Sequence, residues 1–475
     1  MADTARRLGI LQVATADRAG GAERCATDLH RSFRDLGHDS WLAVGTKMES
    51  DPDTFEIPND DQRNAWVRYW NKTRHVHAHR IGRIRGMGRT TSFIRSLGEP
   101  RRWVHRQLGV EDFDFPGTLG LLDLTPRIPD IVHCHNLHGG YFDLRALAPI
   151  SDRVPTILNL HDAWLLSGHC AFSMDCNRWK HGCGKCPDLT LFPAVRRDAT
   201  AYNWERKRKI FTESRVYVTT PSHWMMDRIK DSICASAIIE SRVIPNGVDT
   251  SIFSPGDKTA ARKELGIPIG SRVLLFAANG IRHNVWKDYK TLSAAIRILD
   301  ETKAVPDLIL IAVGESAKTE TIGTTSIQFV PFQKEASVMA KYYRAADMYV
   351  HAARVESFGN VLLEARACGT TVVATAVGGI PEHVKSLACD FAAKGIRQYP
   401  RSEANGVLTQ TGNSNSLANA VLYLLNNPEL LVELGTNGLR EIRDNFSVSL
   451  QAEKVLSWYG EIIDSRRRSS LTRRA

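Results

Sequence analysis

Short apolar runs alternate with longer amphipathic stretches along most of the chain. In its first half, runs rich in Val, Ile and Leu predict buried strands at 8–14, 40–44, 131–135, 156–160 and 215–219. The first run leads into an amphipathic stretch at 22–36, which ends at Gly37 and predicts a helix. Because strands alternate with helices in this way, the pattern predicts a parallel, doubly wound sheet.

The turn Pro245-Asn246-Gly247 interrupts this pattern, and the pattern then begins again. Strands are predicted at 273–277, 308–313, 327–329, 348–351 and 370–374, followed by helices at 416–425, 429–446 and 450–463. The fold class is therefore α/β, with Rossmann-like domains at 1–244 and 245–447. A helix and a basic tail follow at 448–475.

The segment 349–377 carries the strongest candidate chemistry. Its strand leads to Glu356, then to Ser357, Phe358, Gly359 and Asn360 in a turn, and then to a helix that contains Glu364. Ligands of open α/β sheets bind at the carboxyl ends of the strands, and free amides at a helix start suit an anion. Each carboxylate can accept from two hydroxyl groups, so the pair suits a hydroxyl-rich ligand. The alternative is that Glu364 is a solvated helix residue.

Three motifs give the chain a resemblance to the glycosyltransferase family 4 enzymes, which retain anomeric configuration and have the GT-B fold. They are Glu356-x7-Glu364, the run Ile244-Pro245-Asn246-Gly247-Val248-Asp249, and Gly20-Gly21-Ala22-Glu23. The resemblance implies that 1–244 is the acceptor side and 245–447 binds a nucleotide-sugar donor across a cleft. It also implies that the helix in 448–475 crosses back to the first domain.

The resemblance further implies roles for individual residues. Glu356 would hold the transferred sugar, and Glu364 would hold the ribose of the nucleotide. Arg282 and Lys287 would meet the charge of the donor diphosphate, although Asp288 replaces the usual glycine and leaves Lys290 as a substitute for Lys287. Residues Ser357, Phe358, Gly359 and Asn360 would line the donor, and Gly20 and Gly21 would approach its phosphates or the acceptor. His161 would lie near the transferred sugar. Independently of the resemblance, His133 and His135 also follow a strand, and we expect them on the acceptor side.

Four cysteines cluster in the insert 161–187: Cys170, Cys176, Cys183 and Cys186. In a reducing compartment such a cluster predicts a structural zinc site, with His169 and His181 as reserve ligands. Disulfides and free thiols remain alternatives. The resembling subgroup of colanic-acid and capsular polysaccharide glycosyltransferases carries a similar insert. No catalytic metal or other cofactor is expected.

The net charge of +10 is concentrated in two places. Between Gln62 and Gln107, twelve Arg or Lys residues face one acid, Glu99, with aromatic residues interleaved, and the tail adds five arginines. This basic insertion, about 60–110, suits an anionic membrane surface. A nucleic-acid site lacks a supporting motif, and a solvated insertion remains an alternative. Without a signal peptide or spanning helix, we expect a cytoplasmic protein at the inner face of the cell membrane.

Two further classes can be weighed against the transferase. A dinucleotide enzyme would carry a G-x-G-x-x-G motif after its first strand, and none is present. A catalytically silent glycan- or nucleotide-binding module could use the same scaffold, but Glu356, Glu364, Arg282 and Lys287 are all retained. The sequence therefore predicts a retaining hexosyltransferase. It would use a nucleotide-diphosphate sugar and a glycan or lipid-linked acceptor in surface polysaccharide synthesis.

Overall fold

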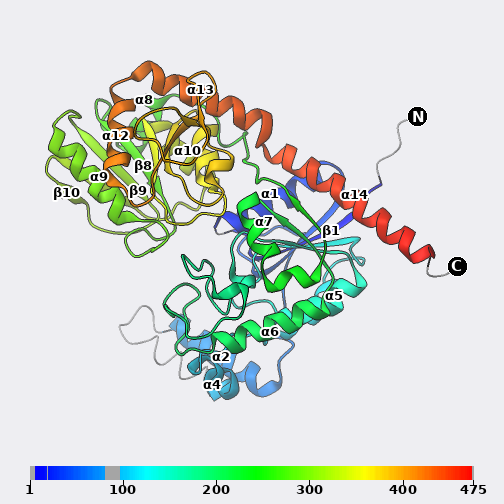
Figure 1. Ribbon diagram of the computed structural model, residues 1–475. Helices are drawn as coiled ribbons and strands as arrows, with labels where there is room; N and C mark the ends of the chain where they lie inside the picture. Colours follow the sequence, from blue (N-terminus) through cyan, green and yellow to red (C-terminus); the bar gives the residue numbers. More distant parts are fainter. Residues whose placement is uncertain (1–5, 19, 81–96, 473–475) are drawn as a thin grey trace, which may run out of the picture. The chain divides into compact units, whose positions relative to one another are not determined.

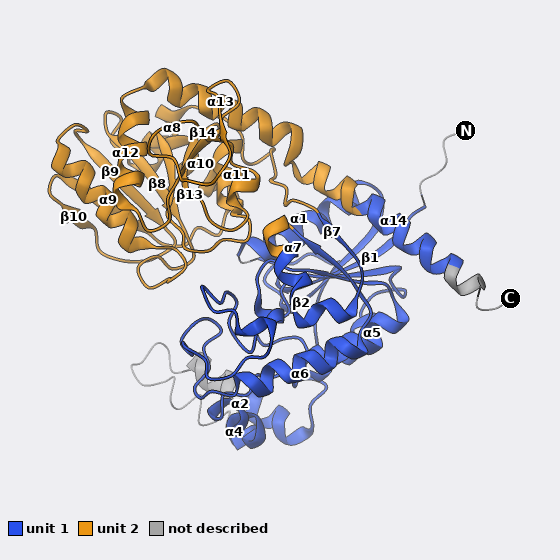
Figure 2. Ribbon diagram, viewed as in Figure 1, with its two compact units in different colours: residues 1–220, 226–243, 456–475 blue, residues 221–225, 244–455 orange. Residues whose placement is uncertain are grey.

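The structure, a computed structural model, describes residues 6–18, 20–80 and 97–472 (Figure 1). The chain forms two compact units (Figure 2). Unit 1 comprises residues 1–220, 226–243 and 456–475, and unit 2 comprises residues 221–225 and 244–455. Each unit is built around its own sheet, as the repeated strand pattern predicts.

The sheet of unit 1 has seven parallel strands in the order β3-β2-β1-β4-β5-β6-β7. They are β1 (Gly9–Ala16), β2 (Asp39–Thr46), β3 (Thr54–Glu56), β4 (Ile131–Cys134), β5 (Thr156–Asn159), β6 (Val216–Thr220) and β7 (Ile238–Val243). The five predicted strands are confirmed. The edge strands β3 and β7 were not predicted, because β3 is only three residues long and β7 is partly exposed.

The helices of unit 1 include α1 (Gly21–Asp35), α2 (Ala65–Arg80), α4 (Pro100–Gln107), α5 (Leu147–Arg153) and α6 (Thr200–Glu213). The register pairs Val13 with Cys134 and Cys134 with Leu158. Strands β1, β4 and β5 therefore end at the same edge of the sheet. The loops that follow them carry Gly20, His135 and His161.

The sheet of unit 2 has nine strands in the order β10-β11-β9-β8-β12-β13-β16-β14-β15, parallel except for β10 with β11. They are β8 (Arg272–Ala277), β9 (Leu308–Val313), β10 (Glu320–Ile322), β11 (Thr325–Val330), β12 (Met348–His351), β13 (Thr371–Thr375), β14 (Ser386–Leu387), β15 (Gln398–Tyr399) and β16 (Gly406–Thr409). Alternate residues of β8 and β9 belong to two different apolar clusters, one on each face. Burial on both faces explains why these strands appear as continuous apolar runs.

Helices cover both faces of this sheet. They are α8 (Lys258–Leu265), α9 (Tyr289–Thr302), α10 (Ala336–Ala345), α11 (Asn360–Ala367), α12 (Ser414–Leu425) and α13 (Pro428–Asn445). The helix α7 (His223–Lys230) begins in unit 2 and ends in unit 1, whereas the last helix, α14 (Val448–Thr472), belongs to unit 1 from Leu456 onward. In the described part of the chain, no helix combines the length and apolar character required to span a membrane.

Candidate functional site

Glu356 lies in the loop between the central strand β12 and helix α11. Its carboxylate forms an ion pair with the Lys287 ammonium, and its Oε2 lies 3.5 Å from His351 Nε2 at the end of β12. Burial opposes ionisation, but the Lys287 charge and the His351 contact lower the pKa of Glu356 below its ordinary value. Glu356 is therefore an anion held by a cation from another loop.

A glycine pair fixes the backbone that carries Glu356. The Gly379 N–H donates to the Glu356 carbonyl oxygen at 3.1 Å, and Ser222 Oγ donates to the Ser357 carbonyl at 2.7 Å. A Cβ on Gly378, whose φ is +58°, would lie only 1.7 Å from the Glu356 carbonyl. Only glycine fits this position, because any side chain there would displace the loop.

Lys287 ends the loop between β8 and α9, next to the residue that departs from the family pattern. Asp288 is buried and caps α9, accepting from the Thr291 N–H at 3.3 Å and the Thr291 hydroxyl at 2.7 Å. Arg354 Nε lies 3.4 Å from the Asp288 carboxylate. The aspartate thus has a structural role, and Lys287 rather than Lys290 contacts Glu356.

Arg282 lies in the same loop but has different partners. Its Nε donates to Glu315 Oε1 at 2.7 Å, its NH1 lies 3.6 Å from Glu320, and its guanidinium carbon lies 5.1 Å from the centre of the Phe329 ring. Glu315 also accepts from the N–H groups of Ile281 and Arg282 at 2.9 Å. The structure therefore brings Lys287, but not Arg282, into contact with Glu356.

Glu364 lies inside α11 with 7% of its surface exposed, so the alternative of a solvated helix residue is wrong. The Tyr343 hydroxyl donates to Glu364 Oε2 at 2.8 Å. At the helix start, Gly359 has a φ of +86°, and Asn360 Oδ1 accepts from the side-chain amide of Asn246 at 2.9 Å. This last bond joins the predicted motif at 244–249 to the start of α11.

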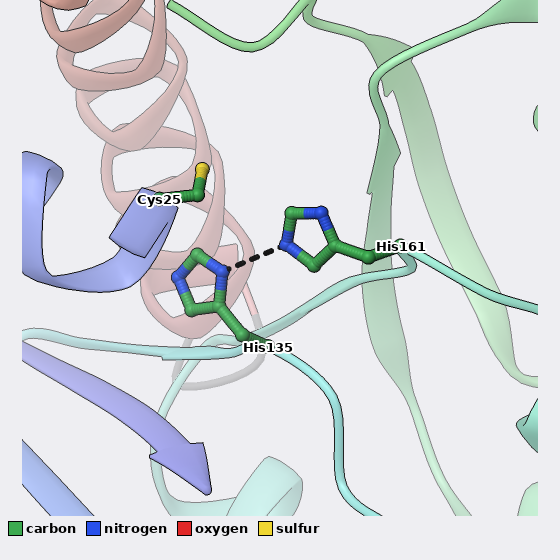
Figure 3. A group of neighbouring side chains, drawn as sticks. All are labelled: Cys25, His135 and His161. Carbon is green, nitrogen blue, oxygen red and sulfur yellow. Dashed lines mark hydrogen bonds between the residues drawn. The ribbon is translucent and has the colours of Figure 1, made fainter. Parts of the chain in front are cut away.

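In unit 1, three histidines at the ends of β4 and β5 form a buried polar cluster with Gln12 of β1. The rings of His135 and His161 are stacked, and His135 Nδ1 lies 3.0 Å from His161 Nε2 (Figure 3). The rings of His133 and His135 are also stacked, with ring centres 4.8 Å apart. Burial lowers the pKa of His161 to about 4 and that of His133 to about 3, so both rings are neutral near pH 7.

Cys25 of α1 adds a thiol to this cluster. Among the described residues, only the group of Cys25, His135 and His161 brings three potential metal ligands within 4.8 Å of one another. Gly20 and Gly21 open the same helix, where the Gly20 carbonyl accepts from the Arg24 N–H at 3.1 Å. The hydrogen bond between the two histidines accounts for their approach without a metal ion.

The four clustered cysteines are free thiols, so the disulfide alternative has no support in the structure. Their sulfurs are less tightly grouped than the ligands of Cys25, His135 and His161. Burial, with the neighbouring Cys170 and Cys176, raises the pKa of Cys183 to about 12. His169 Nδ1 lies 3.0 Å from the Pro193 carbonyl, and its Nε2 lies 3.4 Å from Cys186 Sγ. His169 is thus the reserve ligand that contacts the cluster.

The basic insertion is only partly described, and Arg83, Arg85 and Arg89 lie outside the described residues. Within the described part, Arg63 and Arg102 pair with Glu99 at 2.7 and 2.5 Å, and Arg106 pairs with Asp112 at 2.6 Å. The two pairs with Glu99 join separate parts of the insertion, and the pair with Asp112 connects it to the residues that directly follow it. Three of its aromatic residues are exposed, by 59% at Trp66, 63% at Tyr69 and 42% at Trp103, whereas Trp70 is half-buried.

A cavity of about 320 Å³ lies in unit 1. Its lining includes His138, Gly139, Gly140 and Trp164. His138 Nε2 lies 2.7 Å from the Asp162 carboxylate, which raises the pKa of His138 although burial opposes the shift. Its Nδ1 is buried without a hydrogen-bond partner among the described residues. A protonated His138 would offer that nitrogen to a ligand oxygen.

Several residues of the site were missed in the sequence. His351 looks like a strand residue, Gly378 and Gly379 look like an ordinary turn, and Gln12 and Tyr459 look like core positions. Gln12, Gly378, Gly379 and Tyr459 contact predicted residues only through the tertiary fold, whereas His351 contacts Glu356 of the loop that directly follows its strand. The glycine pair carried a usable signal, because two glycines follow a strand end there, as at Gly20-Gly21.

Comparisons with known proteins agree with this architecture. Residues 19–252 match the family model described as Glycosyltransferase Family 4, and residues 257–441 match that described as Glycosyl transferases group 1. The solved structure of Anabaena HepE in complex with UDP and glucose superimposes with a TM-score of 0.58 at 18% identity, covering 96% of this chain and all of that one. Sucrose-phosphate synthase from Thermosynechococcus elongatus gives a TM-score of 0.60 at 17% identity, covering 97% of this chain and all of that one.

Curated relatives match over a shorter region. The D-inositol 3-phosphate glycosyltransferase of Segniliparus rotundus is 33% identical over 229 residues, which are 46% of each chain. The colanic acid biosynthesis glycosyl transferase WcaC of Escherichia coli is 25% identical over 264 residues, which are 52% of this chain and 60% of that one. The chain thus spans about half the length of the curated relatives it matches. Together with the family models, these findings show that it belongs to the family 4 glycosyltransferases and has the GT-B fold.

Proposed function

We propose that the protein is a retaining glycosyltransferase that moves a hexose-type sugar from a nucleotide-diphosphate sugar to a glycan or lipid-linked acceptor. The observation that carries this proposal is the ionised Glu356, held by Lys287 and His351 at the carboxyl end of β12. A carboxylate fixed in this way can bind sugar hydroxyls without rearranging. Two structures of Anabaena HepE, one in complex with UDP and glucose and one with UDP-glucose, support a nucleotide-sugar donor.

The reaction breaks the bond between the sugar C1 and the phosphate oxygen and forms a bond from C1 to an acceptor oxygen. The acceptor proton passes to the departing phosphate oxygen on the same face, so charge and atoms balance. In this proposal Lys287 and Arg282 meet the charge that develops on the leaving diphosphate. Glu364 holds the ribose, the segment 357–360 lines the donor, and His161 orients the sugar. Gly20 and Gly21 let the backbone approach the phosphates or the acceptor.

Kinetics of three variants test these roles. Glu356→Gln should lower kcat with little effect on nucleotide affinity, since Glu356 is assigned to the sugar whose charge changes. Glu364→Gln should mainly raise KM, because ribose does not react. Arg282→Ala should lower kcat by about 10²–10³-fold, the range for one donor to a developing anion. The assay measures transfer, or donor hydrolysis if no acceptor is found, with nucleotide affinity measured separately.

Arg397→Ala is the matched control, because Arg397 is an exposed arginine of unit 2 that stacks on Tyr399 rather than approaching Glu356. The rival function is a catalytically silent binding module on the same scaffold. Nucleotide-sugar turnover by the wild type would exclude it. Wild-type rates in both Glu356→Gln and Arg282→Ala would falsify the assignment of the site.

We further propose that the acceptor enters the cavity beside His138 and that the product is a surface polysaccharide. The cavity combines an aromatic wall, formed by Trp164, Phe115 and Phe142, with a buried His138 nitrogen that has no hydrogen-bond partner in the described part of the chain. Small-molecule ligands commonly bind in cavities where apolar and aromatic side chains surround a few placed polar groups. The relative WcaC, whose name assigns it to colanic acid biosynthesis, supports this pathway class.

The basic insertion is proposed to hold the protein at the anionic inner face of the cell membrane. Exposed Trp66, Tyr69 and Trp103 beside basic residues are suited to the headgroup region of a bilayer. Trp66→Ala/Tyr69→Ala should weaken sedimentation with anionic vesicles. The triple variant Arg83→Ser/Arg85→Ser/Arg89→Ser should also weaken this sedimentation, and it should reduce the salt dependence of vesicle binding. Phe332→Ala, at an exposed position of unit 2, is the control. Vesicle binding unchanged in both multiple variants would remove this role.

Cys170, Cys176, Cys183 and Cys186 are proposed to bind a structural zinc ion. Zn²⁺ binds well to thiolates and to a histidine whose other ring nitrogen is hydrogen-bonded to a carbonyl. His169 is such a histidine, because its Nδ1 lies 3.0 Å from the Pro193 carbonyl. The purified protein should then contain about one equivalent of zinc. Cys183→Ser should lose metal and stability together, because metal binding contributes to the folding free energy. A metal-free preparation of full stability would contradict the site.

A further inference from the structure

Two buried residues outside the predicted site, Gln12 and Tyr459, lie in one chain of polar contacts with the histidines. The Tyr459 hydroxyl lies 2.5 Å from His133 Nδ1, and Gln12 Nε2 lies 3.4 Å from the same hydroxyl. Gln12 Oε1 lies 2.8 Å from His135 Nε2, and His135 Nδ1 lies 3.0 Å from His161 Nε2. All these residues belong to unit 1.

The distances give this chain a direction. A separation of 2.5 Å lies in the range of an O–H donor and below that of an N–H donor. Tyr459 therefore donates its proton to His133 Nδ1, and its oxygen is free to accept. It accepts from the Gln12 amide nitrogen, which leaves the Gln12 oxygen facing His135 Nε2.

An amide oxygen only accepts, so His135 carries its proton on Nε2. Since His135 is neutral, its Nδ1 has no proton and must accept the hydrogen bond from His161 Nε2. His161 therefore carries its proton on Nε2, and its own Nδ1 has a free lone pair. Part of the His161 side chain remains exposed, whereas His133 and His135 are buried.

We infer that Gln12, His135 and Tyr459 are positioning residues that hold His161 as the Nε2–H tautomer, with Nδ1 ready to accept a hydrogen bond from a substrate hydroxyl. The inference rests on the proposed function, because it gives His161 a defined task at the transferred sugar. A His161 of the opposite tautomer would present an N–H to a hydroxyl and lose that acceptor. The chain of contacts thus links the C-terminal helix α14 to the ring that orients the sugar.

The tautomer can be measured without any substrate. In protein labelled with ¹⁵N-histidine, two-bond nitrogen–proton spectra should show His161 protonated on Nε2, with the His161→Gln variant providing the assignment. In Tyr459→Phe the Gln12 amide loses its partner and can rotate, so the opposite tautomer should appear for His135 and His161. A wild-type His161 protonated on Nδ1 would overturn the inference. Loss of turnover alone would bear only on the proposed function.

Kinetics provide the second readout. His135→Leu should lower kcat about tenfold, as expected for one hydrogen bond, while UDP affinity stays unchanged. His135→Asn should restore most of kcat, because its amide oxygen can accept from His161 Nε2 in place of Nδ1. Equal kcat losses in both variants, together with equal losses of stability in urea, would mean that His135 only fills space.

Metal analysis separates this inference from a metal site at Cys25, His135 and His161. If the tautomer assignment is correct, the zinc content should be the same in wild type and in Cys25→Ser. Zinc that is lost in Cys25→Ser but kept in Cys183→Ser would show that these three residues hold a metal ion. That result would overturn the tautomer chain, because both facing nitrogens would then bind metal.

Discussion

At the scale of single residues, the ion pair between Lys287 and Glu356 makes a prediction about pH. The lowered pKa of Glu356 means that its carboxylate stays ionised below the ordinary value of 4.5. In Lys287→Met the pKa should rise, because burial then lacks its main opposing charge. The acid limb of the kcat profile should therefore move to higher pH. A profile of unchanged position, measured on an enzyme of unchanged fold, would contradict the role of this pair.

The same shift has a consequence for stability. Because the folded-state pKa of Glu356 is lowered, its contribution is fully present above the unfolded value and is lost as pH falls through the folded value. Unfolding of the wild type in urea should show this loss on acidification below about pH 4.5. Lys287→Met should lose less of its unfolding free energy over the same pH range.

A second residue-scale prediction concerns Lys207, which is fully buried in unit 1. Its ammonium contacts the Glu111 carboxylate at 2.9 Å and donates to the carbonyls of Trp164 and Ser167 at 2.9 Å. Lys207→Met leaves the buried Glu111 charge unpaired and should cost about 3–5 kcal/mol of unfolding free energy. Adding Glu111→Gln should recover much of this loss in urea unfolding. If the double variant were no more stable than the single one, the unpaired charge would not be the cause.

The sequence could predict the features of single residues that depend on neighbouring positions in the chain, but not those that depend on distant ones. Glu356, Glu364 and Lys287 stand in motifs with fixed spacing, and the structure places Glu356 in the loop after β12, Glu364 inside α11 and Lys287 just before α9. The partners of Arg282 were not predictable, because Glu315 and Glu320 reach it through the pairing of other strands. The burial of Glu364 depends on Tyr343 from α10, which no local pattern shows.

At the scale of elements, Asp288 illustrates a departure from a family motif that has a local physical reason. It caps α9, so Asp288→Ala should cost about 1 kcal/mol, whereas Asp288→Asn keeps an accepting oxygen and should cost less. Both can be measured by urea unfolding. Glu335→Ala is the control, since Glu335 precedes α10 without capping it through its side chain. Equal losses in Asp288→Ala and Asp288→Asn would contradict the capping role.

The elements also show where sequence patterns fail. Strands buried on both faces, such as β8 and β9, are continuous apolar runs and were predicted. The short strands β14 and β15 have two residues each and hardly differ from loop sequence. β16 is fully buried but has only four residues, two of them Gly and Thr, so its apolar signal is weak.

At the scale of the whole molecule, the last helix, α14, contributes to both compact units, as the short helix α7 also does. From Leu456 onward α14 belongs to unit 1, where Trp458 and Tyr459 are fully buried. Trp458 also donates to Glu240 Oε1 at 2.9 Å and packs edge-on against Tyr217 of β6. The C-terminal segment is therefore part of the core of a unit whose other residues lie more than two hundred positions earlier.

This connectivity predicts a selective loss of stability. Trp458→Ala should destabilise unit 1 by about 3–5 kcal/mol, the cost of removing a large buried aromatic side chain. Unit 2 has its own apolar clusters and should keep its stability. Hydrogen exchange followed by mass spectrometry can measure the stability of each unit separately. We expect faster exchange in β1, β4 and β6 of unit 1, but not in β8, β9 and β12 of unit 2. Val432→Ala, at an exposed position on α13, is the control. Equal acceleration in both sheets would mean that the two units unfold as one cooperative body, and α14 would then stabilise the molecule as a whole rather than unit 1 alone.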